Sequence, residues 1–304
     1  MTQLNKRSEL VFIYDIKDAN PNGDPLDANK PRIDEETGIN IVTDVRLKRT
    51  IRDYLYEYKG FNGENGKDIF VREIKDKKGD LQDGKTRAKD FDEDSKKVLD
   101  SCIDVRMFGG VIPLSGDSIK YTGPVQFQMG RSFHSVEIKH IKGTGAFAAR
   151  SGKSNKTFRE EYILPYSLIG FYGIINENAA KTTGLTQEDI DLLIEGMWKG
   201  TKNLITRSKV GQTPRLLLKV NYSEDNFFIG EIKNYINLNT DKRDEEIRDP
   251  EDFELDLTNL IEILEENKSN IESVEYINNP RLKCICSGNI IELSELDMFK
   301  EITL

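Results

Sequence analysis

The chain has 304 residues, of which 37% are hydrophobic and 32% are charged, and its formal net charge is −9. This composition is typical of a soluble globular protein and excludes a disordered one. No apolar run reaches the roughly 20 residues that a membrane span needs, and the first residues lack the apolar core of a signal peptide. Three cysteines are too few for a disulfide framework. We therefore expect a cytoplasmic protein without a membrane partner.

The charge is unevenly distributed along the chain. Residues 105–160 contain nine Lys or Arg against three Asp or Glu, and residues 201–222 contain five against none. Residues 223–280 contain five against seventeen. Because local charge sets the field that a ligand meets in a groove, the acidic total does not exclude a polyanionic ligand at the two basic segments.

The first elements are a strand, a polar loop and a helix. Residues 10–16 are β-branched and aromatic, which predicts a strand, and the spacing of residues 44–59 predicts a helix that Thr43 caps and Gly60 ends. At 100° per residue, one apolar arc of this helix contains Leu47, Ile51, Tyr54, Leu55 and Tyr58. The opposite side contains Arg46, Lys48, Arg49 and Arg52. It is either a solvated basic face or a row of cations for a phosphate backbone.

The loop between these elements begins like a calcium-binding loop at residues 18–23. The match fails because the twelfth loop position is Asn29, where calcium needs a bidentate Glu. We expect no metal there and expect Asn20 and Asn22 to meet phosphate or ribose, with simple turn formation as the alternative. A metal-dependent nuclease could use the loop carboxylates as ligands, namely Asp15, Asp18, Asp24 and Asp27.

The remaining pattern predicts a mixed α+β fold. We expect an inserted subdomain over residues 61–104 with a helix at 88–101, and a glycine turn at 109–110. Further strands are expected at 118–128, 162–175 and 215–222, and helices at 186–198 and 253–267. Cys284 and Cys286 are expected on one face of a strand. The core order β-α-β-β-α-β is the ferredoxin-like plan that RNA-recognition domains share.

Two glycine-rich basic segments interrupt this order. Residues 138–159 form either a solvated loop or an extended arm for a polyanion, with Arg150, Lys153 and Lys156 as its cations. The Gly152-Lys-Ser154 triplet is no phosphate-binding P-loop, because Phe147 stands where that motif needs Gly. Residues 207–215 form a basic loop whose N–H groups can contact phosphates. His134, near Arg131, is either a contact residue or a histidine of the core or surface.

A series of motifs resembles a known family. They are residues 12–25 (Phe-Ile-Tyr-Asp-Ile-Lys-Asp-Ala-Asn-Pro-Asn-Gly-Asp-Pro), residues 43–52, residues 104–110, residues 122–127, Gly130-Arg-Ser132 and Leu164-Pro-Tyr166, in this order. Together they resemble the backbone subunit of type I CRISPR surveillance complexes (Cascade). This is the Cas-seven family of the RAMP superfamily, and the branch looks like type I-B.

The resemblance implies a modified RNA-recognition core with an inserted finger and a thumb-like β-hairpin. The palm would be residues 1–60 and 105–225, the finger 61–104 and the thumb about 138–162. Residues 226–304 would be an acidic extension packed on the palm. Such subunits are not usually enzymes and need no cofactor. Related type III subunits cut RNA with a loop aspartate, so a metal-dependent endoribonuclease on the same fold is the alternative.

The implied partners are CRISPR guide RNA, target DNA paired with that guide, and further copies of the chain. Other Cascade subunits would join them: a large subunit, a guide-end-capping subunit and a guide-processing endoribonuclease. Phe147 would wedge against a base. The residues predicted to bind RNA are Asn20, Asn22, Thr43, Arg46, Lys48, Arg49, Arg52, Arg131, Ser132, His134, Phe147, Arg150, Lys153, Lys156, Arg207, Lys209, Gly211 and Gln212.

Overall fold

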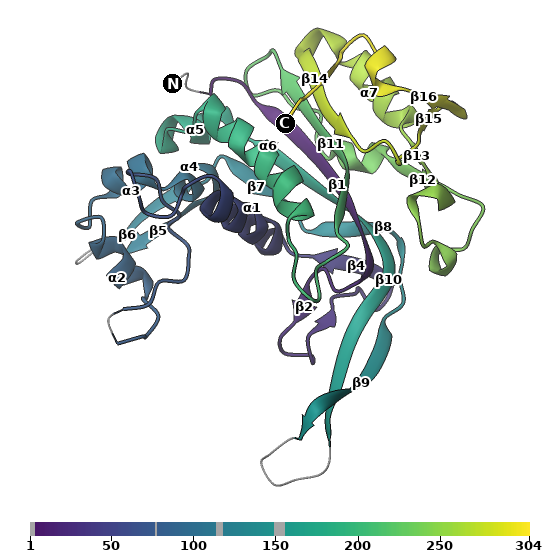
Figure 1. Ribbon diagram of the computed structural model, residues 1–304. Coiled ribbons are helices and arrows are strands. Elements are labelled where there is room, and N and C mark those ends of the chain that lie inside the picture. The colour runs from purple at the N-terminus through teal and green to yellow at the C-terminus, as the bar shows by residue number, and fades with distance from the viewer. Residues whose placement is uncertain (1–3, 77, 114–117, 149–155) are drawn as a thin grey trace.

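A large twisted sheet forms the centre of the molecule. The computed structural model describes residues 4–76, 78–113, 118–148 and 156–304 (Figure 1). The central strand β1 (Ser8–Ala19) pairs antiparallel with β10 (Lys156–Ile175) on one side and with β11 (Thr213–Tyr222) on the other. Its first nine residues are all buried, because layers cover both faces of the sheet. This double burial explains the continuous apolar run from Leu10 to Tyr14.

The sheet continues outward from these three strands. Its order is β17-β14-β11-β1-β10-β8-β4, and β7 and β9 also pair with β10. The outer strands are β14 (Ile271–Asn278), β17 (Phe299–Glu301), β8 (Gly130–Ser135), β4 (Ile39–Val42) and β7 (Val125–Phe127). Between β1 and β4, β2 (Gly23–Asp24) and β3 (Lys30–Pro31) form a small separate ribbon.

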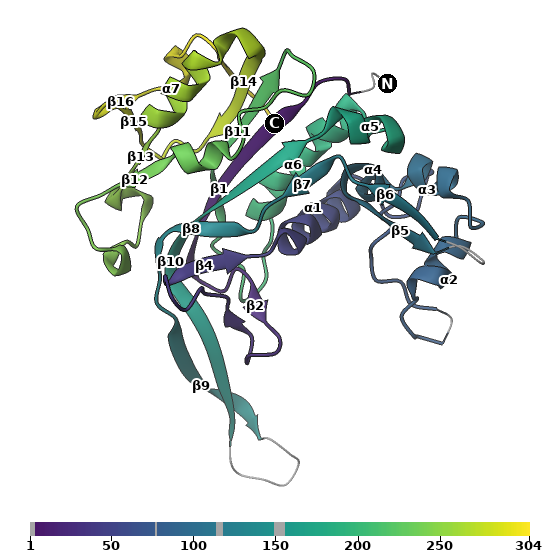
Figure 2. The same cartoon turned by 180° about the vertical axis from the view of Figure 1, so that it is seen from behind.

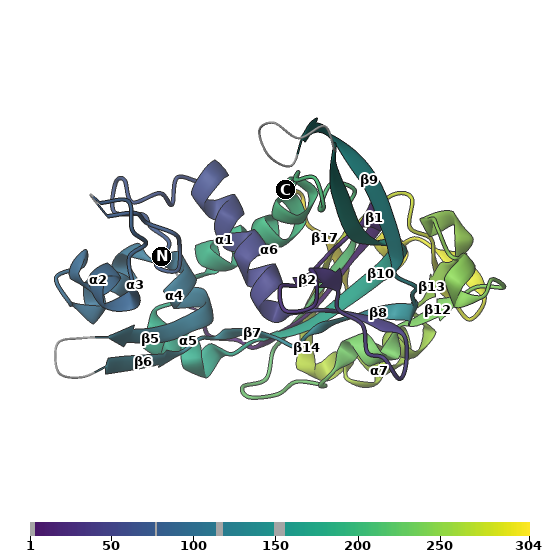
Figure 3. The same ribbon diagram turned by 90° about the horizontal axis from the view of Figure 1, so that it is seen from below.

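Two helices cover one face of the sheet. The helices α1 (Asp44–Tyr58) and α6 (Gln187–Lys202) lie side by side there (Figure 3). Gly196 and Gly200 of α6 permit this approach, since an added Cβ would lie 3.0 Å from Ile51 and Tyr54 of α1. The predicted Thr43 cap and the Thr186–Asp189 capping box are both present. Tyr58 is 56% exposed, so its expected place in the buried arc of α1 is wrong.

The C-terminal region covers the opposite face (Figure 2). Its second core contains Val11 and Leu218 of the large sheet together with Phe253 and Leu260. The region holds α7 (Thr258–Glu266) and a small sheet of β12 (Asn237–Asn239), β13 (Glu254–Asp256), β15 (Cys284–Cys286) and β16 (Asn289–Ile291). The two C-terminal cysteines lie on a strand, as predicted. The helix expected from residue 253 begins only at Thr258, because the residues before it form β13, which pairs with β15.

The inserted region folds around a small core of its own. Its elements are α2 (Gly84–Lys89), α3 (Ser95–Ser101), α4 (Ile103–Phe108), and the hairpin of β5 (Gly109–Pro113) and β6 (Ser118–Thr122). The single helix predicted over 88–101 is wrong: Asp92 and Glu93 have left-handed backbone (φ 57° and 55°), and Asp94 caps a new helix. The predicted strand 118–128 is split into β6 and β7. The small core extends past residue 104 to Ile112.

A long hairpin projects from the body of the molecule (Figures 1 and 2). It consists of β9 (Lys139–Ala148) paired with the first part of β10. At the other end of β10, α5 (Glu177–Thr183) leads into α6. No helix in the described part of the chain is long and apolar enough to cross a membrane.

Candidate nucleic-acid interface

Two of the four cations on α1 are turned toward the inserted region. Arg52 Nε donates to Asp104 Oδ2 at 2.9 Å, and Lys48 Nζ lies 3.0 Å from Asp44 Oδ2 and 3.1 Å from Gln126 Oε1. Both side chains are only 12% exposed, and both lie over the ring of Phe108. Asp104 also accepts the N–H groups of residues 70 and 71. Arg52 therefore joins α1 to the inserted region by an ion pair, whereas Lys48 contacts that region only at the ring of Phe108.

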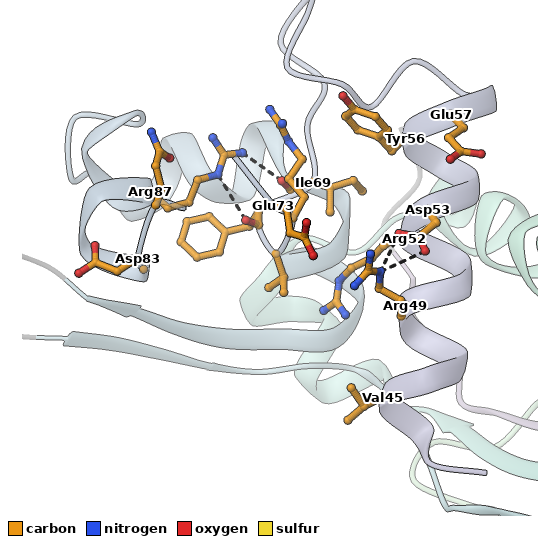
Figure 4. Close-up of a pocket in the computed structure, with 15 residues that line it drawn as sticks. Val45, Arg49, Arg52, Asp53, Tyr56, Glu57, Ile69, Glu73, Asp83 and Arg87 are labelled. Carbon is orange, nitrogen blue, oxygen red and sulfur yellow. Dashed lines mark hydrogen bonds and ion pairs between the residues drawn. The ribbon is translucent and has the colours of Figure 1, made fainter. Parts of the chain in front are cut away.

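A third cation, Arg49, lies at a cleft between α1 and the inserted region. Figure 4 shows Arg49 beside Asp53, with Val45 and Tyr56 on the same wall. The Arg49 Nε–Asp53 Oδ1 distance is 3.0 Å, and the Arg49 side chain is 55% exposed. The cleft has a volume of about 670 Å³. Each of its arginines is ion-paired, and its lining also contains Glu57 and Glu73. The cleft itself therefore offers a strand of phosphates no unpaired cation.

The fourth cation, Arg46, is different because no acid of the described structure is bonded to it. Its Nη2 donates to Thr50 Oγ1 at 2.9 Å, and its Nε is buried without a hydrogen-bond partner among the described residues. Burial lowers the pKa of its guanidinium. Lys209 lies near it: burial, and then the charge of Arg46, lower the pKa of Lys209 to about 8. Two cations therefore lie close together, and both side chains are partly buried.

Asn20 completes this group. Lys209 Nζ donates to the backbone oxygen of Asn20, and Asn20 Nδ2 donates to Asn29 O at 2.7 Å. The Asn20 side-chain oxygen, like Arg46 Nε, is buried and unpartnered in the described structure. We call Asn20, Arg46 and Lys209 the Arg46–Lys209 cluster. It joins the loop after β1, the first turns of α1 and the loop at 203–212.

Other predicted residues support the backbone around this cluster. Asn22 Oδ1 accepts both the N–H and the hydroxyl of Thr43, at 2.9 and 3.0 Å, and so fixes the start of α1. Gly211 has φ +98°, and a Cβ there would lie 3.0 Å from Lys17 O. Gln212 Nε2 donates to Lys209 O at 3.2 Å. Close packing on β1 thus requires a glycine at position 211, independently of any ligand that the loop contacts.

The predicted residues of β8 have mixed environments. Arg131 is half-exposed and lies 3.5 Å from Asp34 Oδ2. Ser132 is buried and donates to His134 O at 2.6 Å. His134 is 2% exposed; its Nδ1 donates to Ser135 O and its Nε2 accepts the N–H of Leu168. Burial lowers the pKa of His134. The ring is neutral. Of the alternatives that the sequence left open for His134, its buried position agrees with a histidine of the core.

The predicted residues of the projecting hairpin are described only in part. Phe147 lies on β9 and Lys156 begins β10, but their side chains are outside the described structure, and Arg150 and Lys153 are outside it entirely. Nearer the body, His140 stacks on Tyr162 with 4.5 Å between ring centroids. Arg207, from the loop after α6, forms an ion pair with Glu161 of β10 and so ties this loop to the base of the hairpin.

Three of the four loop carboxylates are paired with side chains of the fold. No group of three His, Cys, Asp or Glu in the described residues could hold a metal ion. Asp15 is buried, bonded to Arg215 Nε at 2.7 Å and to the Tyr166 hydroxyl at 2.8 Å, and burial raises its pKa. Asp24 pairs with Arg32 at 2.9 Å and Asp27 with Lys30 at 2.8 Å.

Sequence patterns missed two residues near these sites. Asp104 holds Arg52, yet it lies 52 positions away in the chain, so no helical spacing could reveal the pair. Arg32 has a buried Nε without a partner among the described residues and donates its backbone N–H to Asn22 O at 3.3 Å. It lies in a polar loop without periodicity, which gives no signal of its position.

Comparison with known proteins identifies the class. The family model described as CRISPR-associated protein Cas7 matches residues 6–258. A curated relative from Haloferax volcanii, the CRISPR-associated protein Cas7, is 33% identical over 326 residues, covering 97% of this chain and 93% of the relative. The chain therefore belongs to the Cas7 family of CRISPR-associated proteins.

Solved structures show the same fold. A chain of a pre-nicking CRISPR RNA-guided surveillance complex matches with a TM-score of 0.55 at 12% identity, over 92% of this chain and 96% of that one. A chain of another CRISPR RNA-guided surveillance complex matches with a TM-score of 0.52 at 12% identity, over 90% and 88%. These matches support the predicted α+β class and extend over nearly the whole molecule.

Proposed function

We propose that this chain is the non-catalytic backbone subunit of a type I CRISPR surveillance complex (Cascade), of the I-B-like branch. It binds CRISPR guide RNA through the phosphates, polymerises along it and presents it for pairing with target DNA. The large subunit, the guide-end-capping subunit and the guide-processing endoribonuclease are its further partners. Membership of the Cas7 family and the fold shared with chains of RNA-guided surveillance complexes support this role.

The observation that carries the proposal is the Arg46–Lys209 cluster. The charge of Arg46 acts on Lys209, and neither cation has a bonded acid among the described residues. An anion placed between them would offset this effect and accept from the free Arg46 Nε. Phosphate is such an anion, and backbone phosphates supply most of the sequence-independent affinity for nucleic acids. Sequence would then be read by base pairing, as in other RNA-guided systems.

The order of the strands supports placing the RNA on the side of the large sheet that α1 and α6 cover. The order β11-β1-β10-β8, with α1 and α6 on one face, supports the proposed RNA-recognition core, whose plan has this order of strands. In such domains bases stack on the open face of the sheet. Here the second core, with Phe253 and Leu260 of the C-terminal region, fills that face. The guide must therefore use α1 and the loops beside it.

The projecting hairpin provides the contact between copies. In Figures 1 and 2 the described outer part of the hairpin stands away from the rest of the chain, so we assign it the role of the thumb that folds over the guide held by the next copy. Phe147, Arg150, Lys153 and Lys156 are its proposed guide contacts. The inserted region, held to α1 through Asp104 and Arg52, takes the role of the finger.

Binding to two guide RNAs with unrelated spacers tests the proposal. Filter binding at several salt concentrations should give equal affinities for both guides and a steep fall with salt. A strong preference for one spacer, or affinity that does not change with salt, would refute the phosphate mechanism. Labelled RNA should stay intact with Mg²⁺. Cleavage that disappears in Asp18→Ala or Asp24→Ala would instead establish the endoribonuclease.

A further inference from the structure

The acidic C-terminal region contains a notch beside α7. The notch lies between α7 and the segment that leads into β17, and its volume is about 230 Å³. Its walls are Ile261 and Leu264 of α7 and Leu296, Met298 and Phe299 of the following segment. Leu264 and Phe299 belong to the second core, while the other three are only partly buried against it. The apolar core of the C-terminal region thus reaches the surface here.

The rim of the notch is acidic. Glu265, Glu295 and Asp297 line it together with the apolar residues. Glu265 pairs at 3.2 Å with Lys268, and both side chains are more than half exposed. Glu295 and Asp297 form no ion pair within the described part of the chain, so at least two carboxylates at the rim are available to a cation from another molecule.

Size and charge together define the occupant. Pockets for small molecules usually measure roughly 300–1,000 Å³, and this notch is smaller, about the size for one large side chain. A buried apolar anchor surrounded by polar contacts is typical of protein–protein interfaces. The carboxylates repel phosphates, which excludes nucleic acid. They favour Lys or Arg beside the anchor.

We propose that the notch is a docking site for a partner protein whose segment inserts one large apolar side chain between Lys or Arg residues. The notch belongs to the layer on the face of the sheet opposite α1, and Figures 1 and 2 show α7 and α1 on opposite sides of β1. The partner and the nucleic acid can therefore bind at the same time.

A labelled model peptide tests the chemistry directly. The probe has one leucine flanked by two lysines on each side in a Gly/Ser background, and fluorescence anisotropy with the full chain measures its binding. We expect saturable binding to one site, at least tenfold weaker when the leucine is replaced by serine. Equal binding of the serine peptide, or no saturation, would overturn the proposal, because charge alone would then explain the contact.

Two matched pairs of charge-reversal variants test whether the peptide binds in the notch. Glu295→Lys with Asp297→Lys should weaken the peptide at least tenfold, whereas Glu262→Lys with Glu266→Lys, exposed positions of α7 outside the notch, should change it less than threefold. Thermal melting checks that both variants fold. Equal effects of the two pairs would refute the notch as the binding site.

Sedimentation velocity adds a second criterion: self-association that the notch variant abolishes would make a second copy the occupant and overturn the proposal. Guide RNA affinity should not fall in either variant.

Discussion

The two sides of α1 carry the same kinds of cation in opposite surroundings. Toward the inserted region, Lys48 and Arg52 have acid partners at 3.0 and 2.9 Å and are nearly buried. Toward the loop after β1, Arg46 has a neutral partner, a free buried Nε and a second cation, Lys209, beside it. The cations of the first side are paired with acids, and those of the second have no ion pair within the part of the chain that the structure describes.

This difference shows that a basic helix face does not by itself define a nucleic-acid surface. A desolvated Arg with a carboxylate partner holds parts of the protein together, and removing its partner is strongly destabilising. A ligand phosphate would stabilise a partly buried cation that has no acid partner, because it would supply the missing opposite charge. Under the proposed function, the positions of the acids in the fold decide which cations remain available to RNA, and this comparison can be tested from both sides.

The largest effect is expected on the incomplete side. Arg46→Ala with Lys209→Ala should weaken guide binding at least a hundredfold, since each hydrogen bond to a charged group contributes about 1.5–3 kcal/mol. The slope of log K against log salt should fall by about 0.7, since the two cations share one single-strand phosphate. Lys85→Ala with Lys89→Ala on α2 removes the same charge as a control. Equal losses in both pairs would mean that net charge, and not the cluster, controls affinity.

On the complete side the effect should fall on stability. Asp104→Ala leaves Arg52 buried without its partner and two N–H groups without an acceptor. We expect the free energy of unfolding to drop by about 3–5 kcal/mol, measured by urea denaturation. Guide affinity of the folded protein should stay within threefold. Lost RNA binding with unchanged stability would move Arg52 to the RNA surface.

A smaller effect should appear with pH. The pKa of Lys209 is about 8, so the cation is progressively lost above this pH and guide affinity should fall, by at most about tenfold per pH unit for one proton. In the free protein the sign is opposite: the unfolded lysine keeps its proton to about pH 10.4, so stability rises with pH between the two values. Lys209→Arg should abolish the pH dependence of guide affinity; a persistent slope would assign it to another group.

Sequence patterns predicted those features that depend on near neighbours. The Thr43 cap and the buried positions Leu47, Ile51 and Leu55 follow from local periodicity and capping, whereas β8 (Gly130–Ser135) was not predicted and the strand expected at 118–128 is divided. Asp44 and Asp53 also stand four residues from the cations that they pair with, a spacing visible in the sequence.

The distinction between the two sides of α1 could not be predicted in this way. It rests on Asp104, and on Lys209, which meets Asn20 across 189 positions. Such contacts exist only once the sheet has brought distant loops together. The same limit applies to His134: its sequence neighbours suggested an exposed contact as readily as a core position, while β10 supplies the N–H that its ring accepts.

The smallest effect concerns Arg49, which lies between the two sides. Its exposed pair with Asp53 should contribute at most about 1 kcal/mol to stability, so Arg49→Ala should change urea denaturation little and guide affinity less than threefold. Burial lowers the pKa of Arg46, and the charge of Asp53 opposes part of this lowering, so Asp53 offsets part of the positive field of the cluster. Asp53→Ala should therefore strengthen guide binding slightly, even when combined with Arg49→Ala. If the gain from Asp53→Ala disappears in the double variant, Asp53 acts by restraining Arg49, and the RNA surface extends one turn further along α1 than the Arg46–Lys209 cluster.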